Sequence, residues 1–431
     1  MIQLRDRIVL FVITVVSLVL AISVQTTTVQ TNGNEVVVLV DESLLHFDAI
    51  KAISIQRDSM LLEFEKKDGA WKQIVPFRLR MDPASMRALI ESVQGLQILG
   101  ALSEESSDEV IGVAEGANFI ELSDGTRTVR VVLGRKTLGG RAYAKIDGGE
   151  PVLVGQSLHR RAIDMDYRLW RDIRLFPDFA IDGERIERNA DGDRLLIERI
   201  DGRWKMRDPV SARVNQAMLT EWVGTLAAAR VGRYVVDEPD DLAMFGLDTP
   251  AAIFSTTDRK GNVHALWIGG RVSAGSQDRY VMLAGKPVVF RMTMDALSQL
   301  FPVPEMFVDS TGSAVSKFDV KQVIIRMDDR ETKFSRKIDR WVDVQGIQAD
   351  GAAIESLLRW ILETNPLSVA IAPYPRDQEV ATITLVGYDS VPLDTVRIAL
   401  DESGQWILEN GDNVLRLHPS ESGEVFASFQ H

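Results

Sequence analysis

The side chains best suited to catalysis or metal binding are sparse in this sequence. Its histidines are scattered and show no metal-ligand spacing, and cysteine is absent, which excludes thiolate metal sites and cysteine nucleophiles. No H-E-x-x-H, Walker A, G-x-G-x-x-G or G-x-S-x-G motif is present. We therefore expect no catalytic residue, metal site or cofactor. The histidines, each interpreted as a surface or core residue, are His46, His159, His264, His418 and His431.

Two glycine-bearing stretches have the composition of a phosphate cradle. "GRKTLGGR" spans residues 134–141 and "GGRVSAGSQDR" spans 269–279, with Arg135, Lys136 and Arg141 in the first. A phosphate site of this kind depends on a helix whose N-terminal N–H groups face the anion. No helix is predicted directly after either stretch, so the pattern favours flexible hairpin loops.

Two acidic runs occupy equivalent places, "SEESSDE" at 103–109 and "DEPDD" at 237–241. Clustered carboxylates can bind Ca²⁺, but an EF-hand loop requires alternating ligands, a fixed glycine and a distal Glu. Neither run has that pattern. Solvated loops are the favoured interpretation, and weak divalent binding is the alternative.

A cluster of charges beside an aromatic residue, "DYRLWRDIRLF", lies at 166–176. Arg168, Arg171 and Asp172 belong to it, and Asp309 occupies the position corresponding to Asp172 further along the chain. A carboxylate can accept two parallel hydrogen bonds from a guanidinium. We interpret these residues as a clamp between neighbouring modules, with a partner-docking patch as the alternative.

The elements that carry these residues recur along the chain. "KKDGAW", "RIDGRW" and "RKIDRW" end in Trp71, Trp204 and Trp341, which are 133 and 137 residues apart. Alternating strands precede each tryptophan, and Asp-Gly in the first two copies is typical of a tight hairpin turn. An amphipathic helix with an Asp or Asn N-cap follows, starting at Asp82, Asn215 and Asp350. We expect each tryptophan to pack its hairpin onto that helix; an exposed ligand-stacking role is the alternative.

A second signature follows in each unit. Tyr143 corresponds to Tyr280 and Gly148 to Gly285, whereas the third unit places Trp406 at the tyrosine position. Self-similarity at a fixed period indicates a tandem array. The sequence therefore predicts three α+β modules, each made of antiparallel hairpins and one main helix. Their predicted boundaries are 50–181, 182–317 and 318–431, the last being degenerate. If the modules are independent, removal of the third leaves a folded two-module protein.

The N-terminal segment predicts the cellular location. Residues 8–24 are uncharged and apolar, at the short end of what crosses a bilayer. Arg5 and Arg7 precede this segment, and no Lys or Arg occurs in the following linker before Lys51. The positive-inside rule then places residues 1–7 in the cytoplasm, 8–24 in the inner membrane, and the linker 25–49 with all modules outside. A cleaved signal peptide is the alternative.

Overall composition narrows the class of partner. The 431 residues carry a net charge of −13, which argues against nucleic acid, because phosphate binding needs a basic surface. An apolar fraction of 45% with 26% charged residues is that of a globular protein. Composition therefore indicates a folded protein and argues against a nucleic-acid partner.

The repeated units resemble the domain of unknown function 4340 family. The resemblance is carried by the strand–Asp-Gly–Trp–helix units with "FGLDTPAAI" at 245–253 and "YVMLAGKPVVF" at 280–290, and is strongest over 182–300. The first unit departs with "IGVAEGANF" (111–119) and the third with "APYPRDQEVA" (372–381). The resemblance implies a single-pass membrane protein encoded beside ABC-2-type permeases and gliding-motility-type proteins. It implies no activity and no catalytic residues.

Three functions fit these observations. The first is a non-enzymatic envelope protein whose extracytoplasmic modules form a binding or scaffold arm accessory to an ABC-type transport complex. The second is a lipid- or glycan-binding protein with a groove across the modules, since repeat arrays expose long binding surfaces. The third is an envelope hydrolase that uses two carboxylates about 5–10 Å apart in a cleft.

Overall fold

The computed structural model describes residues 37–101, 107–177, 179, 183–338, 340–427 and 429. The predicted membrane segment 8–24, the N-terminal residues 1–7 and the linker up to residue 36 lie outside these ranges. Within them, no helix is long and apolar enough to cross a membrane. The chain divides into two compact units, one up to Asp172 and one from Ile173 onward.

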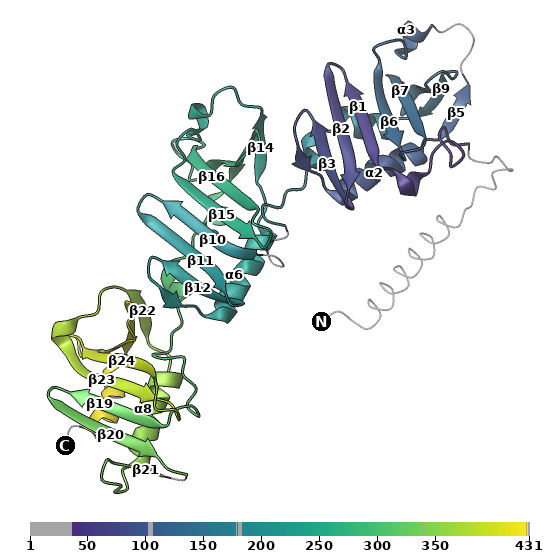
Figure 1. Ribbon diagram of the computed structural model, residues 1–431. Helices are drawn as coiled ribbons and strands as arrows, with labels where there is room; N and C mark the ends of the chain where they lie inside the picture. Colours follow the sequence, from purple (N-terminus) through teal and green to yellow (C-terminus); the bar gives the residue numbers. More distant parts are fainter. Residues whose placement is uncertain are drawn as a thin grey trace, which may run out of the picture. The chain divides into compact units, whose positions relative to one another are not determined.

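Each predicted module interval contains one antiparallel sheet (Figure 1). The first is ordered β4-β3-β2-β1-β6-β7-β8-β9-β5. Its strands are β1 (Ala52–Arg57), β2 (Met60–Lys67), β3 (Ala70–Val75), β4 (Leu79–Arg80), β5 (Ile98–Ala101), β6 (Asn118–Ser123), β7 (Thr128–Thr137), β8 (Arg141–Ile146) and β9 (Val152–Gly155).

The second sheet is ordered β13-β12-β11-β10-β15-β16-β17-β18-β14. Its strands are β10 (Gly183–Ala190), β11 (Asp193–Ile200), β12 (Arg203–Asp208), β13 (Ala212–Arg213), β14 (Arg233–Asp237), β15 (Ala252–Asp258), β16 (Val263–Arg271), β17 (Arg279–Leu283) and β18 (Val288–Met292).

The third sheet is ordered β21-β20-β19-β23-β24-β25-β26-β22. Its strands are β19 (Gln322–Met327), β20 (Arg330–Arg336), β21 (Trp341–Val342), β22 (Ser368–Ile371), β23 (Glu379–Val386), β24 (Pro392–Leu400), β25 (Trp406–Glu409) and β26 (Val414–His418). This order repeats that of the other two sheets, without a counterpart of β4 and β13. The α+β prediction is therefore correct only in coarse terms, because the described chain is mostly antiparallel sheet with few helices.

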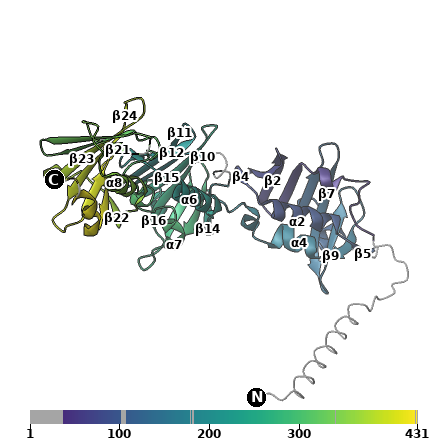
Figure 2. The same cartoon turned by 90° about the horizontal axis from the view of Figure 1, so that it is seen from below.

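One main helix per module connects the two edges of its sheet. α2 (Pro83–Gln94) joins β4 to β5, α6 (Gln216–Ala228) joins β13 to β14, and α8 (Gly351–Glu363) joins β21 to β22. Each helix therefore crosses one face of its sheet, as Figure 2 shows for α2, α6 and α8. The predicted N-caps are confirmed: Asp82 accepts a hydrogen bond from Ser85 N, and Asn215 and Asp350 each accept two from their first helical turns.

Short helices connect the remaining elements. They are η1 (Phe47–Ala49), α3 (Asp108–Ile111), α4 (Ser157–His159), η2 (Arg160–Asp164), η3 (Tyr167–Trp170), η4 (Ala243–Phe245), α7 (Met294–Ser298), η5 (Pro304–Met306), η6 (Arg376–Gln378), η7 (Ser420–Gly423) and α9 (Glu424–Ala427).

The helix-facing side of each sheet is the main core. Trp71 lies in the first core with Met86 and Leu89 of α2, Trp204 in the second, and Trp341 in the third. Val414 of the third module belongs to the core of the second module, and Val369 and Ile371 pack against it. These two modules therefore share part of one core.

A smaller cluster covers the opposite face of each sheet. Tyr143 packs on the 111–113 loop, and Tyr280 on Phe245, with ring centroids 5.1 Å apart. Gly269 allows this loop to approach, because a Cβ there would lie 2.3 Å from Phe245 O. Gly134 occupies the corresponding place in the first module, where a Cβ would lie 2.6 Å from Ile111 O.

The third module uses different residues on this face. Ala399 takes the glycine position, and Tyr374 packs on it together with Ile407. By strand register, Ile407 and not Trp406 is the counterpart of Tyr143 and Tyr280. The sequence alignment of Trp406 is therefore wrong by one residue. A shift of one residue along a strand moves a side chain to the other face, and Trp406 lies in the helix-side core.

Candidate functional site

The three signature tryptophans are buried in the cores. Trp71, Trp204 and Trp341 are 3–5% exposed. Arg199 lies over Trp204 and Arg336 over Trp341, with 4.8 and 4.7 Å between guanidinium carbon and ring centroid. Such contacts stabilise by about 0.5–2 kcal/mol. With so little exposed area these rings are core residues, and Trp341 also lines a surface hollow of the third module.

Gly148 and Gly285 both lie in hairpin turns, with φ of +75° and +72°. A left-handed backbone at these positions favours glycine because it has no Cβ. Their recurrence is therefore a turn requirement that fixes the register of β8 with β9 and of β17 with β18.

The predicted clamp residues of the first module contact their own module. Asp172 pairs with Arg80, Nε to Oδ2 at 3.2 Å. Arg171 is 2% exposed and lies between the rings of Phe77 and Tyr167, at 5.6 and 5.3 Å. Arg171 is therefore held between two aromatic rings of the first module.

Arg168 and Asp309 complete the predicted set. Arg168 donates to Asp166, the N-cap of η3, and is therefore a local capping partner. Asp309 accepts from Arg213, Nη1 to Oδ2 at 3.1 Å, within the second module. The ion pairs of Asp172 and Asp309 thus join the end of each module to that module's own edge strand. Asp309 O also accepts from Arg416 Nε of the third module at 3.0 Å, and the clamp between modules stays a prediction.

The backbone shows how this attachment is built. We define the exit segments as residues 170–172 and 307–309, and the receiving segments as 80–82 and 213–215. Asp82 N donates to Trp170 O and Asp172 N to Arg80 O, at 2.8 and 2.9 Å. Asn215 N donates to Phe307 O and Asp309 N to Arg213 O, also at 2.8 and 2.9 Å. Each exit segment therefore pairs with its receiving segment as a short extra strand at the edge of the sheet.

The aromatic residue of each exit segment enters the core. Trp170 contacts Phe64 with ring centroids 5.9 Å apart, and Phe307 contacts Trp222 at 4.6 Å. Both aromatic side chains are 1% exposed. Each exit segment thus follows one pattern: a buried aromatic residue, any residue, and an Asp paired with an Arg.

The corresponding receiving segment of the third module is 348–350. Ala349 N donates to Trp341 O, as Met81 N does to Trp71 O, which establishes the equivalence. Among the residues that the structure describes, no hydrogen bond reaches Gln348 O or Asp350 N. Residues of this segment line two surface hollows.

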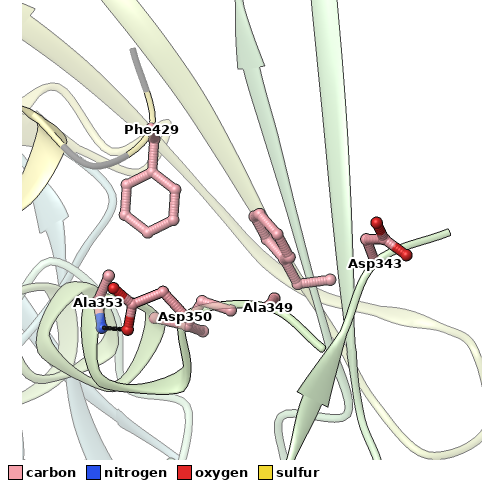
Figure 3. Close-up of a pocket in the computed structure, with 7 residues that line it drawn as sticks. Asp343, Ala349, Asp350, Ala353 and Phe429 are labelled. Carbon is pink, nitrogen blue, oxygen red and sulfur yellow. Dashed lines mark hydrogen bonds between the residues drawn. The ribbon is translucent and has the colours of Figure 1, made fainter. Parts of the chain in front are cut away.

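The first, which we call the apolar hollow, has a volume of about 210 Å³. Figure 3 shows the Phe429 ring above the start of α8, where Asp350 accepts from Ala353 N at 3.1 Å. Asp343, the other carboxylate, accepts from Gln345 N and Ile347 N. Both carboxylates therefore cap backbone N–H groups. The hollow is lined by Phe334, Asp343, Ala349, Asp350, Ala353, Ile354 and Phe429.

The second, which we call the cationic hollow, has a volume of about 540 Å³. Its cationic lining is Lys317, Arg336, Lys337 and Arg340, and Gln348, Ala349 and Gly351 line it beside the receiving segment. Ile338, which is fully exposed, and Phe318, which is 82% exposed, line it as well. Exposed apolar side chains gathered with cations are typical of an interaction surface.

Glu355 organises the floor of the cationic hollow. It accepts from Lys317, Arg336 and Trp341 at 2.8, 2.8 and 2.9 Å. Burial by itself would raise the pKa of Glu355, but the hydrogen bonds from Lys317 and Trp341 and the charge of Arg336 bring it below its ordinary value. The carboxylate is ionised and already engaged at neutral pH, so it is a structural anchor for these cations.

The other sequence candidates have structural partners. Lys136 pairs with Asp164 at 2.7 Å, which does not fit the phosphate-cradle interpretation. Asp241 accepts a hydrogen bond from Ala243 N at the start of η4, and Asp108 pairs with Lys145. Residues 103–106 of the first acidic run lie outside the described ranges. In the described part of the chain, no three His, Asp or Glu side chains are grouped to hold a metal ion.

The buried histidines lie in different surroundings. His159 contacts Gly134 O through Nε2 at 3.1 Å. His418 is fully buried, with its ring centroid 5.6 Å from that of Trp360. Burial, with the charge of Arg416 adding to it, lowers the pKa of His418 to about 4. His418 is therefore neutral at pH 7, a core residue as expected.

The receiving segment of the third module was not anticipated from the sequence. Two substitutions could have indicated it. Gly351 stands where Pro83 and Gln216 begin the other helices, and Ile338 stands where the other hairpins have the Asp of Asp-Gly. The first leaves no side chain at the start of α8, beside Trp341, and the second places an apolar side chain at an exposed turn.

Comparison with known proteins gives one match. A family model described as Domain of unknown function (DUF4340) matches residues 204–383, from the tryptophan of the second module into β23 of the third. Searches of curated proteins and of solved structures each found no match.

Proposed function

With the resemblance to the DUF4340 family confirmed over residues 204–383, we propose that this protein is a non-enzymatic, single-pass membrane protein of the bacterial envelope. Its modules lie outside the cytoplasmic membrane and act as a binding scaffold accessory to an ABC-type transport complex. The anchor is the apolar segment 8–24, and the arginines before it keep the N-terminus in the cytoplasm.

One observation supports a binding role above others, namely the threefold recurrence of the same strand order. Repeated modules create a long surface whose residues vary while the scaffold is kept, and this is how repeat proteins bind partners. The two hollows on the third module add local features of an interface. Their carboxylates cap helices or hold cations, which fits a binding surface better than the hydrolase alternative.

A lipid- or glycan-binding protein is the second candidate. The observation that favours it is the cationic hollow, where Phe318 and Ile338 lie beside Lys337 and Arg340. Apolar and cationic groups together suit an anionic amphiphile. The volume of about 540 Å³ falls in the range of small-ligand sites, roughly 300–1,000 Å³.

The absence of cysteine allows a direct test of location. A single cysteine at Leu138, which is 93% exposed, should react with a membrane-impermeant maleimide in intact spheroplasts. A cysteine at Asp6 should react only after the membrane is permeabilised. Labelling of both sites, or of Asp6→Cys alone, in intact spheroplasts would contradict the proposed topology.

The partner is tested by purifying the tagged full-length chain from mildly solubilised native membranes. Recovery of a permease and its ATPase supports the accessory role. Recovery of a lipid or glycan without those proteins supports the second candidate. A tagged chain ending at residue 49, which retains the membrane segment, is the matched control for association through the anchor.

A further inference from the structure

We infer that residues 348–350 of the third module bind an extended segment of a partner protein with the pattern aromatic, any residue, acidic. The inference rests on the proposed binding function and names the site and the chemistry of the partner. It follows from what the first two modules already hold at the same place.

The first two modules hold their exit segments through one backbone N–H group and one backbone carbonyl group each. Asp82 N and Arg80 O in the first module, and Asn215 N and Arg213 O in the second, are each paired with an exit segment. In the third module the matching groups are Asp350 N and Gln348 O, and within the described residues they have no hydrogen-bond partner. An unpaired sheet edge is a template for an added strand, as in β-augmentation.

The hollows match the two side chains of an exit segment. Trp170 packs on Phe64, whose counterpart by strand register is Phe334, and Phe334 lines the apolar hollow. Asp172 pairs with Arg80, whose counterpart is Gln348 in the lining of the cationic hollow. An aromatic side chain therefore suits the apolar hollow, and an acidic side chain two residues later suits the cationic one.

Other cations of the third module stand near Gln348, which occupies the position of Arg80 and Arg213. Gln348 cannot neutralise a carboxylate as Arg80 and Arg213 do. Lys337 and Arg340, both exposed, line the hollow next to it. Charge complementarity with an acidic side chain is thus retained, although the cation comes from the β20–β21 turn.

A protein segment fits this site better than a lipid surface. The acceptor Gln348 O and the donor Asp350 N are spaced as for a β-strand partner, which a lipid headgroup or a glycan does not supply in that register. Asp319, Asp343 and Asp350 are also exposed or half-buried nearby, and a flat anionic membrane would meet them as well as the cations. A single acidic side chain of a bound peptide would meet only the cations of the cationic hollow.

Phe429 of the same chain already touches part of the site. Its ring lies 5.9 Å from that of Phe334, the same distance as between Trp170 and Phe64. However, Phe429 N donates to Phe426 O, and no hydrogen bond joins Phe429 to Asp350. Phe429 therefore contributes to the wall of the apolar hollow and, among the residues that the structure describes, does not pair with the backbone edge.

The exit segment itself provides the probe. A fluorescent peptide with the sequence of residues 304–312, PEMFVDSTG, is titrated with the full-length chain in detergent micelles, and its anisotropy is recorded. We expect saturable binding. Replacing the peptide's Phe by Ala, or its Asp by Asn, should each weaken binding at least tenfold.

Variants of the chain locate the binding. Ala353→Trp fills the apolar hollow and should abolish binding. The double change Lys337→Glu with Arg340→Glu should weaken it at least tenfold, and leaves the core intact. Arg330→Glu, at an exposed residue of β20 outside both hollows, is the matched control and should change the affinity less than twofold.

Three results would overturn the inference. They are no saturable binding of the peptide, binding that is insensitive to both the Ala353 and the Lys337/Arg340 variants, or binding that requires removal of residues 428–431. The last would identify the chain's own end as the occupant. Failure of the peptide to bind while a permease still co-purifies would reject this site and leave the proposed function standing.

Discussion

Replacement of Arg416 by Met should destabilise the second and third modules together. Arg416 is fully buried where β26 meets the second module. Its Nε donates to Asp309 O at 3.0 Å, and its Nη2 donates to Asp412 Oδ2 at 2.9 Å. Phe290 holds the equivalent position in the second module by register, so an apolar side chain suits the strand itself.

The expected loss of stability comes from the groups that lose their partner in Arg416→Met. Asp412, whose side chain is 9% exposed, would lose its cation, and Asp309 O would lose its donor. Removing one partner of a buried ion pair costs about 3–5 kcal/mol, because the other charge remains desolvated. We expect a loss of this size in the free energy of unfolding. Adding Asp412→Asn should recover part of it, because an unpaired amide costs less than an unpaired carboxylate.

The assay is urea unfolding followed by circular dichroism, combined with hydrogen–deuterium exchange read separately for β10–β18 and β19–β26. Both sets of strands should exchange faster in Arg416→Met, because the modules share the core around Val414. Arg326→Met is the control. The Arg326–Glu331 pair is 64% and 51% exposed, and its loss should cost less than about 1 kcal/mol. Faster exchange confined to the third module, or a loss below 1 kcal/mol in Arg416→Met, would refute the reasoning.

Three further changes follow from the structure. Neutral His418 contributes its full stability above its unfolded pKa of about 6.5, and this contribution is lost as the pH falls toward 4. The free energy of unfolding should therefore be about 2 kcal/mol lower at pH 5 than at pH 7. His418→Met, which introduces the residue found at the equivalent position Met292, should remove that difference. Gly269→Ala should cost about 1–3 kcal/mol in urea unfolding, because its Cβ would lie 2.3 Å from Phe245 O. Trp204→Ala should lower stability by about 3–5 kcal/mol in the same assay, since its ring is buried.

Matched controls separate these effects from general damage. His264→Gln changes an exposed histidine and should keep the pH dependence. Gly275→Ala adds a Cβ with nothing within 4 Å and should be neutral. A wild-type stability that is flat from pH 7 to 5, or equal losses for the two glycine variants, would contradict the corresponding argument. An unchanged melting temperature for Trp204→Ala would favour the exposed ligand-stacking role.

The repeated architecture was predictable because its signals are local. Asp-Gly before Trp71 and Trp204 specifies a hairpin, and an Asp or Asn before each helix specifies its start, so strand–turn–strand–helix order can be derived from neighbouring residues. Trp406 was misplaced because the turn after Ile407 is one residue shorter than the turn after Tyr280. A sequence alignment that preserves the distance to the turn glycine then selects the wrong face.

The clamp was partly predictable from composition. Charges at a junction indicate ion pairs, and Asp172 and Asp309 do form them. Their partners Arg80 and Arg213 lie in short strands far earlier in the chain, with 96 residues between Arg213 and Asp309. Only the sheet topology brings such residues together. For this reason the sequence could identify the carboxylates but not their arginine partners.

The binding edge of the third module was not predictable because it depends on missing contacts. A receiving segment is recognised by comparison with two others whose exit segments are in place. Gly351 and Ile338 have no meaning in isolation. They become informative once Ala349 is seen to be the counterpart of Met81 and Val214.

Whether this protein is an accessory subunit is decided by the stoichiometry of the complex purified from native membranes through the tagged full-length chain, determined by native mass spectrometry. We expect a defined ratio of this chain to a permease and its ATPase, and no such complex for the chain ending at residue 49. Recovery of the chain alone, or with those proteins only in trace amounts, would contradict an accessory role in an ABC-type transport complex.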